Sequence, residues 1–455
     1  MAQNPPRLFG TDGMRGVAGR FPLDAETVSK TGRALGAVLA MNGRARAPRV
    51  VLGEDTRESS AWIARALAAG LRAQAVEVAY AGVITTPGIA YLASRHGFDG
   101  GVVISASHNP FEDNGIKILS SEGTKLSESV ELEIERRMAE TDPVNGLASL
   151  EPNPQLGEQY VEHLAALVPP GLDYSSYRLV VDCANGAASR VAPALFAMLG
   201  IHAEVLHAAP DGRNVNQDCG SLYPEKMARA TRAAGADLGV AFDGDADRAI
   251  FALSDGRIAD GDFVLYAAAN YMEDRGTLRG GAVVGTLMSN FGLEAALGRR
   301  GIGLKRTAVG DKHVLEEMLR SGSNLGGEPS GHIIFADLSL AGDGLVTLLE
   351  MLRIMRETGQ SFAQIVSGLK PFPQRIRNVR VREKPPLEAV PGVSGALAAC
   401  RSELGERGRV VVRYSGTEPV ARVMVEADSA ELVERHVTQI AEAIAAALGT
   451  GESET

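Results

Sequence analysis

The sequence predicts an α/β protein of several domains, in which short buried strands alternate with helices. The chain has 455 residues, too many for one ordinary core, so two to four domains are expected. Runs rich in valine and isoleucine recur, and each leads into a turn with glycine or aspartate and then into a helix-like stretch. This alternation indicates α/β units with largely parallel sheets.

The elements follow in chain order. Strands are predicted over 49–53, 101–104, 178–182, 236–242 and 281–284. Alanine-rich helices are predicted over 60–72 and 188–199. The last block differs, because two strands over 409–413 and 420–427 precede a long helix over 429–448. It therefore predicts a smaller α+β domain, and breaks between domains are expected near 151–154, 255–260 and 370–373.

Composition excludes several classes of protein. The formal net charge is −10, so there is no broad basic field for nucleic acid, and anionic substrates must be bound by local arginine and lysine clusters. No apolar stretch is long enough to span a bilayer. The three cysteines are scattered, without CxxC spacing, and predict neither a metal framework nor a disulfide scaffold. We expect a cytoplasmic protein with no membrane partner.

Ser107 lies in the segment Ile104-Ser105-Ala106-Ser107-His108-Asn109-Pro110, directly after a buried strand. Open α/β sheets bind ligands at that end of their strands. A serine needs a base or prior activation to act as a nucleophile, and the G-x-S-x-G elbow of hydrolases is absent here. Taken alone, the segment fits either an activated serine or a polar turn closed by Asn109-Pro110.

Asp243, Asp245 and Asp247 follow an apolar run at a spacing of two, which on a strand places them on one face. Gathered carboxylates repel one another unless a hard divalent cation lies between them. An EF-hand is excluded because Arg248 and Ser254 occupy the positions that need glycine and glutamate. The interpretation is a magnesium site, and the alternative is an acidic surface turn.

The loop Gly326-Gly327-Glu328-Pro329-Ser330-Gly331-His332 brings a carboxylate, a hydroxyl and an imidazole together. A glutamate that accepts hydrogen bonds from paired hydroxyls would suit a sugar. A plain connecting loop, with a packed or capping histidine, is the alternative.

A third loop, over 413–419, suits a phosphate. It offers the hydroxyls of Ser415 and Thr417 and the backbone N–H groups at Gly416, and the guanidinium groups of Arg413 and Arg422 flank them. The alternative is a β-hairpin turn. A further glycine-rich loop, over 9–16, contains Arg15 but lacks the ending of a Walker loop, so nucleotide binding is unsupported.

These segments, in this order, resemble the α-D-phosphohexomutase superfamily. The matching motifs are 9–16, 104–110 with 114–117, 243–248, 326–332 and 413–419, so the resemblance covers nearly the whole chain. Residues 211–216 and 219–221 resemble the superfamily's glucosamine group. The resemblance implies four domains around a central cleft: three related α/β domains with mixed or parallel sheets (1–154, 155–256 and 257–370) and a smaller α+β domain (371–455).

The resemblance also implies roles for residues. Ser107 is similar to the phosphoserine that donates and recovers the phosphoryl group, and it completes a magnesium site with Asp243, Asp245 and Asp247. The other implied residues are Lys117 and His332 for proton transfer, Arg15, Arg248 and His108 at the reacting centre, Glu328 and Ser330 for sugar hydroxyls, and Arg413, Ser415, Gly416, Thr417 and Arg422 for the second phosphate.

The implied reaction interconverts glucosamine 6-phosphate and glucosamine 1-phosphate, through glucosamine 1,6-bisphosphate as intermediate and activator, and feeds UDP-N-acetylglucosamine and cell-wall precursor synthesis. The implied partner is the phosphosugar, and the chain is expected to be a monomer or homodimer. Pro329 stands where the glucosamine group often has glutamine, so the strictness of amino-sugar preference is left open. The alternatives are a phosphoglucomutase or phosphomannomutase, a metal-dependent sugar-phosphate phosphatase, and an inactive sugar-phosphate sensor.

Overall fold

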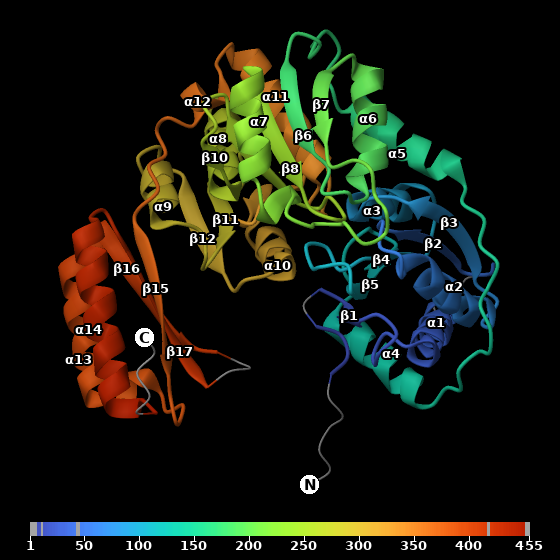
Figure 1. Ribbon diagram of the computed structural model, residues 1–455, viewed down its shortest axis with the longest axis horizontal. Coiled ribbons are helices and arrows are strands. Elements are labelled where there is room, and N and C mark those ends of the chain that lie inside the picture. The colour runs from blue at the N-terminus through green and yellow to red at the C-terminus, as the bar shows by residue number, and fades with distance from the viewer. Residues whose placement is uncertain (1–6, 11, 42–45, 416–418, 451–455) are drawn as a thin grey trace. The chain divides into compact units, whose positions relative to one another are not determined.

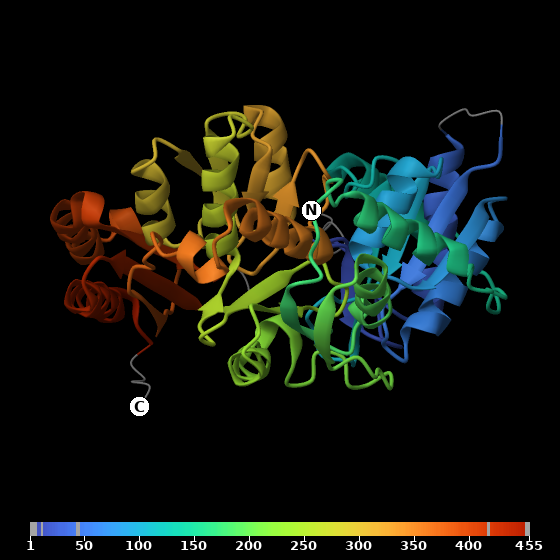
Figure 2. The ribbon, with the colours of Figure 1, turned by 90° about the horizontal axis from the view of Figure 1, so that it is seen from above.

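The computed structural model describes residues 7–10, 12–41, 46–415 and 419–450 (Figures 1 and 2). The chain forms four sheets and divides into two compact units. The larger unit comprises Met1–Met288 and Leu304–Val366, and the smaller one comprises Ser289–Gly303 and Ser367–Thr455.

The first sheet, blue to teal in Figure 1, has the strand order β1-β5-β4-β2-β3. Strand β2 pairs in parallel with β3 and β4, whereas β5 pairs antiparallel with β4 and β1. Helices α1 and α2 cross closely, since a Cβ at Gly32 would lie 2.1 Å from the carbonyl of Leu67. The elements are β1 (Met14–Val17), α1 (Ala25–Ala40), β2 (Arg49–Glu54), α2 (Ser60–Arg72), β3 (Glu77–Val83), α3 (Thr86–Arg95), β4 (Gly100–Ile104), β5 (Asp113–Ser120) and α4 (Glu128–Ala139).

The second sheet has the order β10-β9-β8-β6-β7. Strand β6 pairs in parallel with β7 and β8, and β9 pairs antiparallel with β8 and β10. All five residues of β8 and of β9 are buried, as expected for strands covered on both faces. The elements are α5 (Pro154–Ala166), β6 (Arg178–Asp182), α6 (Ala188–Leu199), β7 (His202–Leu206), the 3₁₀ turn η1 (Gly220–Leu222), α7 (Glu225–Ala234), β8 (Leu238–Phe242), β9 (Ala249–Leu253) and β10 (Ile258–Ala259).

The third sheet has the order β12-β11-β13-β14, with β11 and β13 parallel and β13 and β14 antiparallel. Helices α8 and α10 pack against β13. The elements are α8 (Gly261–Asp274), β11 (Ala282–Thr286), β12 (Gly303–Thr307), α10 (Asp311–Ser321), β13 (Leu325–Gly327), β14 (Ile333–Phe335), α11 (Gly344–Thr358) and α12 (Phe362–Ile365).

The smaller unit contains an antiparallel sheet of order β15-β17-β16, with α13 and α14 packed against it (Figure 1). Its own core joins strand residues such as Val423 and Val425 with Val437 and Ile440 of α14. The elements are α9 (Phe291–Gly298), β15 (Gln374–Arg380), the 3₁₀ turns η2 (Leu387–Ala389) and η3 (Gly405–Arg407), α13 (Pro391–Leu404), β16 (Gly408–Tyr414), β17 (Val420–Ala427) and α14 (Ala430–Leu448).

The predicted fold class is confirmed: three mixed α/β sheets and a smaller C-terminal α+β domain. The sheets contain more antiparallel pairing than the strand-helix alternation indicated. The reason is that each chemistry-bearing loop is a short connection between neighbouring antiparallel strands, too short for a crossover helix. These pairs are β4–β5, β8–β9, β13–β14 and β16–β17. Among the described residues, no helix has the length and apolarity needed to cross a bilayer.

Candidate active site

Ser107 lies just beyond the end of β4 and is 1% exposed. Its φ of 53° is in the left-handed region, which non-glycine residues seldom adopt. The Oγ donates a hydrogen bond to Asp243 Oδ2 at 2.6 Å and lies 3.2 Å from Nδ1 of His108. The backbone therefore directs the hydroxyl at a carboxylate of the aspartate loop.

Side chains from other elements hold the Ser107 loop in this conformation. Arg57 Nη2 donates to the carbonyls of Ser107 and Asn109 at 3.0 and 2.8 Å. Asn216 Nδ2 donates to the same two carbonyls, at 2.8 and 3.1 Å. The hydroxyl of Ser105 accepts from the Ser107 N–H at 2.9 Å. Together these bonds maintain a backbone that would be strained in isolation.

The three aspartates lie in the turn between β8 and β9, not along a strand as their spacing indicated. A positive φ of 57° at Ala246 reverses the chain and still brings the carboxylates together. One oxygen from each lies within 4.8 Å of the others, and all three residues are buried. Gly244 lets the Ser107 loop approach, because a Cβ there would lie 2.5 Å from the Ser107 carbonyl.

The charges of this group favour a divalent cation. Burial, with Asp247 and Asp245 beside it, raises the pKa of Asp243 well above its ordinary value. Oδ1 of Asp245 and Oδ1 of Asp247 are buried without a hydrogen-bond partner in the described chain. Unpartnered carboxylate oxygens with no nitrogen or sulfur donor among them fit magnesium, which prefers oxygen ligands.

Lys117, on β5, is buried against the aspartates. Its Nζ lies 2.7 Å from Asp245 Oδ2 and 3.4 Å from Asp247 Oδ2. Burial lowers the pKa of Lys117, but Asp12, Asp245 and Asp247 outweigh that effect and raise it well above its ordinary value. The ammonium is therefore charged and can donate a proton or hydrogen bond to a bound oxygen.

His332 lies between two carboxylates. Its Nδ1 is 3.7 Å from Asp247 Oδ2, and its Nε2 is 3.8 Å from Asp311 Oδ2. Burial lowers the pKa of His332, whereas Asp247, Asp311 and Glu328 raise it, with a net result of about 8. The imidazole is thus mainly protonated at neutral pH and suits an acid.

Two arginines flank the same centre. Arg248 Nε is 3.8 Å from Asp247 Oδ1 and 3.9 Å from Asp243 Oδ2, and Arg15 donates to Asp12 and to Asn109. Burial, then the positive charge of Arg248 and Arg15, lowers the pKa of His108 to about 4, so its imidazole is neutral. A cavity of about 470 Å³ is lined by Arg7, Asp12, Arg15, His108, Asp247, Arg248, Asp311, Glu328 and His332, with other residues.

Glu328 and Ser330 lie in the turn between β13 and β14. Glu328 Oε1 accepts from the N–H of Gly310 at 3.0 Å, and its carboxylate lines the cavity. Ser330 Oγ is buried and makes no hydrogen bond within the described chain. The carbonyl of Pro329 accepts from the Gly261 N–H at 3.1 Å, which joins the loop to the start of α8.

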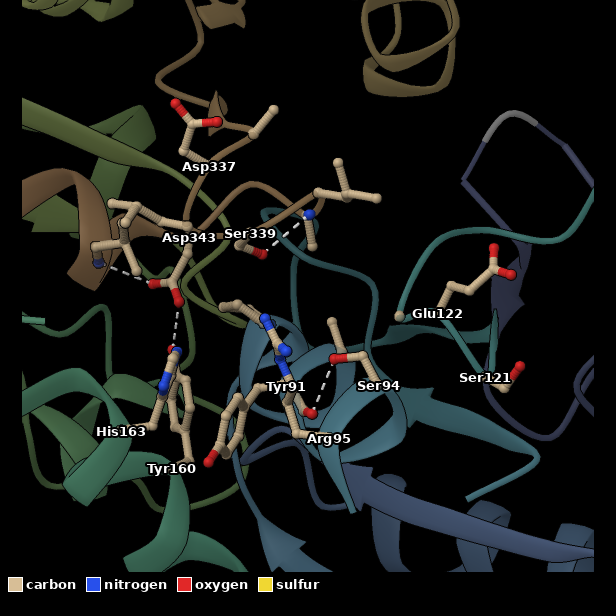
Figure 3. Close-up of a pocket in the computed structure, with 18 residues that line it drawn as sticks. Tyr91, Ser94, Arg95, Ser121, Glu122, Tyr160, His163, Asp337, Ser339 and Asp343 are labelled. Carbon is tan, nitrogen blue, oxygen red and sulfur yellow. Dashed lines mark hydrogen bonds between the residues drawn. The ribbon is translucent and has the colours of Figure 1, made fainter. Parts of the chain in front are cut away.

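Another cavity, of about 300 Å³, lies beside α3 and α5 (Figure 3). Neither Ser107 nor the three aspartates line it, so it is not the reacting centre. Asp343 in its wall accepts from Tyr160 at 2.6 Å and caps α11. The preceding Gly342 abuts the His332 ring, since a Cβ there would lie 2.3 Å from Nε2. This wall therefore anchors the segment behind His332.

The remaining predicted residues belong to the smaller unit. Arg413 and Arg422 are directly opposite on β16 and β17, so their guanidinium groups share one face of the sheet. Like charges in that position are unfavourable unless an anion lies near them. Ser415 is buried, and its carbonyl accepts from Lys384 Nζ at 2.7 Å. Gly416 and Thr417 lie outside the described residues.

Sequence patterns missed a network of charges behind the site. Lys125 Nζ lies 2.6 Å from Asp12 Oδ1 and 2.7 Å from Asp311 Oδ1. Asp12 lies in the glycine-rich loop over 9–16, where only Arg15 was singled out. Lys125 and Asp311 lie in segments without a motif. Arg57 lies between the strand predicted over 49–53 and the helix predicted over 60–72, in a segment without a motif. No local pattern reveals these residues, because their partners are distant in sequence.

Comparisons with known proteins agree with this geometry. The chain matches the four families described as phosphoglucomutase/phosphomannomutase alpha/beta/alpha domains I, II and III and C-terminal domain, over residues 6–145, 158–256, 260–372 and 377–443. It is 51% identical to a phosphoglucosamine mutase of Koribacter versatilis, with 97% of each chain covered. It is 47% identical to one of Solibacter usitatus, with 97% of this chain and 99% of the relative covered.

Solved structures share the fold. A phosphoglucomutase/phosphomannomutase family protein of Burkholderia thailandensis has a TM-score of 0.79 at 26% identity, with 97% of each chain covered. An N-acetylphosphoglucosamine mutase of Aspergillus fumigatus, in complex with GlcNAc-6P and magnesium, has a TM-score of 0.64 at 22% identity, with 89% of this chain and 84% of that chain covered. On its matches to all four domain families and its identity to these relatives over nearly its whole length, the chain belongs to the phosphoglucosamine mutases of the phosphoglucomutase/phosphomannomutase family.

Proposed function

We propose that the protein is an isomerase that interconverts glucosamine 6-phosphate and glucosamine 1-phosphate through phosphorylated Ser107 and a bound glucosamine 1,6-bisphosphate. The observation that carries this proposal is the contact of the buried Ser107 hydroxyl with Asp243, inside an acidic group that Lys117 and His332 also face. Each part suits phosphoryl transfer, in which positioning and charge stabilisation contribute most of the rate.

The side chains of the site have separate roles in the proposed reaction. Phosphoserine 107 donates its phosphoryl group to the free hydroxyl of the sugar phosphate and later receives the other phosphoryl group back. As the phosphoryl group leaves the Ser107 oxygen, that oxygen gains a proton and the attacking sugar hydroxyl loses one. Lys117 and His332, both protonated before the reaction, are the groups proposed to relay this proton. The three aspartates and a phosphoserine oxygen would hold the magnesium ion, which would neutralise charge on the phosphoryl group.

Recognition of the sugar falls to the 328–332 loop. The Glu328 carboxylate lines the cavity and can accept hydrogen bonds from sugar hydroxyls. A protonated amino sugar also carries a positive charge, which a carboxylate attracts, and this favours glucosamine over glucose. Arg413, Ser415 and Arg422, with Gly416 and Thr417 beside them in sequence, are proposed to bind the phosphate that is not being transferred. A cytoplasmic location and a monomeric or dimeric state remain predictions.

The decisive experiment combines an activity assay with phosphorylation mapping. Turnover of glucosamine, glucose and mannose 6-phosphates is compared with Mg²⁺ and a bisphosphate primer, and phosphate is located by mass spectrometry. We expect glucosamine 6-phosphate to be preferred, phosphate on Ser107, and no turnover by Ser107→Ala. Normal turnover by that variant would refute the mechanism, and rapid release of inorganic phosphate from the bisphosphate without a primer requirement would favour the phosphatase.

A further inference from the structure

A second group of metal-ligating side chains lies in the larger unit, away from the aspartate loop. Asp182 ends β6, His207 follows the neighbouring strand β7, and Cys219 immediately precedes η1. One ligand atom from each lies within 4.8 Å of the other two. Asp182 and Cys219 are fully buried, and the His207 side chain is 27% exposed. The cluster therefore meets solvent on the histidine side.

The contact between His207 and Asp182 is short but is not a hydrogen bond. The imidazole Nδ1 lies 2.9 Å from Asp182 Oδ2, yet this buried nitrogen has no hydrogen-bond partner in the described chain. At that separation a poorly aligned pair forfeits most of its hydrogen-bond energy. An imidazole nitrogen and a carboxylate oxygen that lie this close without a hydrogen bond between them are arranged as two neighbouring ligands of one metal ion would be.

Backbone groups fix the carboxylate of Asp182. Its Oδ1 accepts from the Ala184 N–H at 2.8 Å, and its Oδ2 accepts from the Gly220 N–H at 3.1 Å. Supporting hydrogen bonds of this kind orient ligands in metal sites.

We propose that Asp182, His207 and Cys219 bind a transition metal of the zinc type. One nitrogen, one oxygen and one sulfur donor suit Zn²⁺ or Co²⁺, whereas Mg²⁺ requires oxygen ligands. Binding replaces the thiol proton, which leaves to solvent, and forms a metal–sulfur bond. Solvent at the histidine side completes the coordination. The scattered cysteines gave no sign of such a site, because its ligands are brought together by the sheet.

A metal ion bound to this cluster would stabilise a segment with strained backbone. Of the eight non-glycine residues with positive φ in the described chain, five lie around the cluster: Ala184, Asn185, His207, Asn216 and Asp218. Asn216, three residues before Cys219, donates to the carbonyls of Ser107 and Asn109. A bound metal would therefore stiffen the support of the Ser107 loop.

The test is a cobalt titration of the full-length, metal-stripped protein, kept reduced with a phosphine and saturated with Mg²⁺. A thiolate ligand gives Co²⁺ an intense near-ultraviolet charge-transfer absorption, which an all-oxygen site lacks. In the wild type, we expect this absorption to rise with added Co²⁺ and to level off at one equivalent of the metal. In Cys219→Ser, we expect it to be absent. In His207→Gln, affinity should fall on the order of tenfold or more. His207→Gln also decides the question if Cys219→Ser fails to fold.

Cys400→Ser and His202→Gln serve as matched controls, because they remove a buried cysteine and an exposed histidine outside the cluster. Both should retain the wild-type absorption, and Zn²⁺ should displace Co²⁺ and raise the thermal midpoint of the wild type. Absence of the absorption from the wild type, or its survival in Cys219→Ser, would overturn the proposal. Because the readout is optical, it is independent of mutase activity.

Discussion

Arg57→Lys tests whether the mutase chemistry depends on the backbone support of the Ser107 loop. The Arg57 side chain donates to the Asp55 carboxylate at 2.8 Å and to the carbonyls of Ser107, Asn109, Pro110 and Asp113. Lysine keeps the charge but offers three donors on a single nitrogen, so it cannot reach acceptors spread over the whole loop. At least two of these five hydrogen bonds should be lost.

The size of the effect follows from these contacts. A hydrogen bond to a charged group contributes about 1.5–3 kcal/mol, so losing two costs on the order of 3–6 kcal/mol of local stability. Asn216 still holds two of the same carbonyls, so we expect the loop to shift rather than unfold. Displacement of a reacting group by about 1 Å lowers a rate by roughly 100-fold. The expected result is a kcat about 100-fold lower with little change in KM.

The assay measures initial rates over a range of glucosamine 6-phosphate, together with the thermal midpoint and the phosphate content of Ser107. Arg213→Lys is the matched control, because that arginine is 68% exposed and pairs with Glu58 at the surface. It should behave as the wild type. A wild-type kcat in Arg57→Lys, or an equal loss in Arg213→Lys, would refute the reasoning.

Three further predictions concern single residues. Gly244→Ala places a Cβ 2.5 Å from the Ser107 carbonyl and should lower both kcat and Mg²⁺ affinity in kinetic titrations, whereas Gly157→Ala, with no atom within 4 Å, should do neither. Burial raises the pKa of Glu54 from 4.5 to about 7. The folded state therefore binds the Glu54 proton more tightly than the unfolded state does. As the pH rises from 4.5 to about 7, the free energy of unfolding should fall by on the order of 3 kcal/mol. Glu54→Gln should remove this slope from the thermal-midpoint profile. Lys117→Met deletes a cation 2.7 and 3.4 Å from two aspartates. With a chelator present, the thermal midpoint of this variant should be lower than that of the wild type. Adding Mg²⁺ should raise the midpoint of the variant more than that of the wild type. Equal increases in the two proteins would contradict this prediction.

Elements with a strong local signal could be predicted from the sequence. The helices over 60–72 and 188–199 and the strands over 178–182 and 420–427 have the predicted limits. Their apolar runs end at turn residues, and the structure uses those same turns. The antiparallel partners, such as β5, β9 and β14, were harder to identify. Each begins only a few residues after the preceding strand, with no helix between them to mark a unit.

The residues of the site also differ in whether a local sequence pattern reveals them. Ser107 and the three aspartates stand in compact motifs, so their residue types indicated phosphate and metal chemistry. Arg57 and Asn216 act on carbonyls 50 to 109 positions away in the chain, and neither residue type is unusual in its own segment. Only the folded sheets bring donors and acceptors together. The spacing of the aspartates suggested a strand, because the sequence does not show that Ala246 adopts a left-handed conformation.

Under the proposed mechanism, the geometry of the site couples phosphorylation of Ser107 to metal binding. In the unphosphorylated chain, the Ser107 hydroxyl donates to Asp243, whose pKa burial and the two other aspartates raise. Phosphorylation replaces that donor with acceptor oxygens and adds a charge of about −1.5 to −2. The phosphate then faces the aspartates, and Lys117 already balances two of them. The added negative charge must be met by a cation, so metal affinity rises on phosphorylation. Since binding linkage is reciprocal, the metal stabilises the phosphoserine by the same free energy. Under the proposed mechanism, the site would therefore retain its phosphoryl group best with the metal bound, which is also the state in which the sugar phosphate would react.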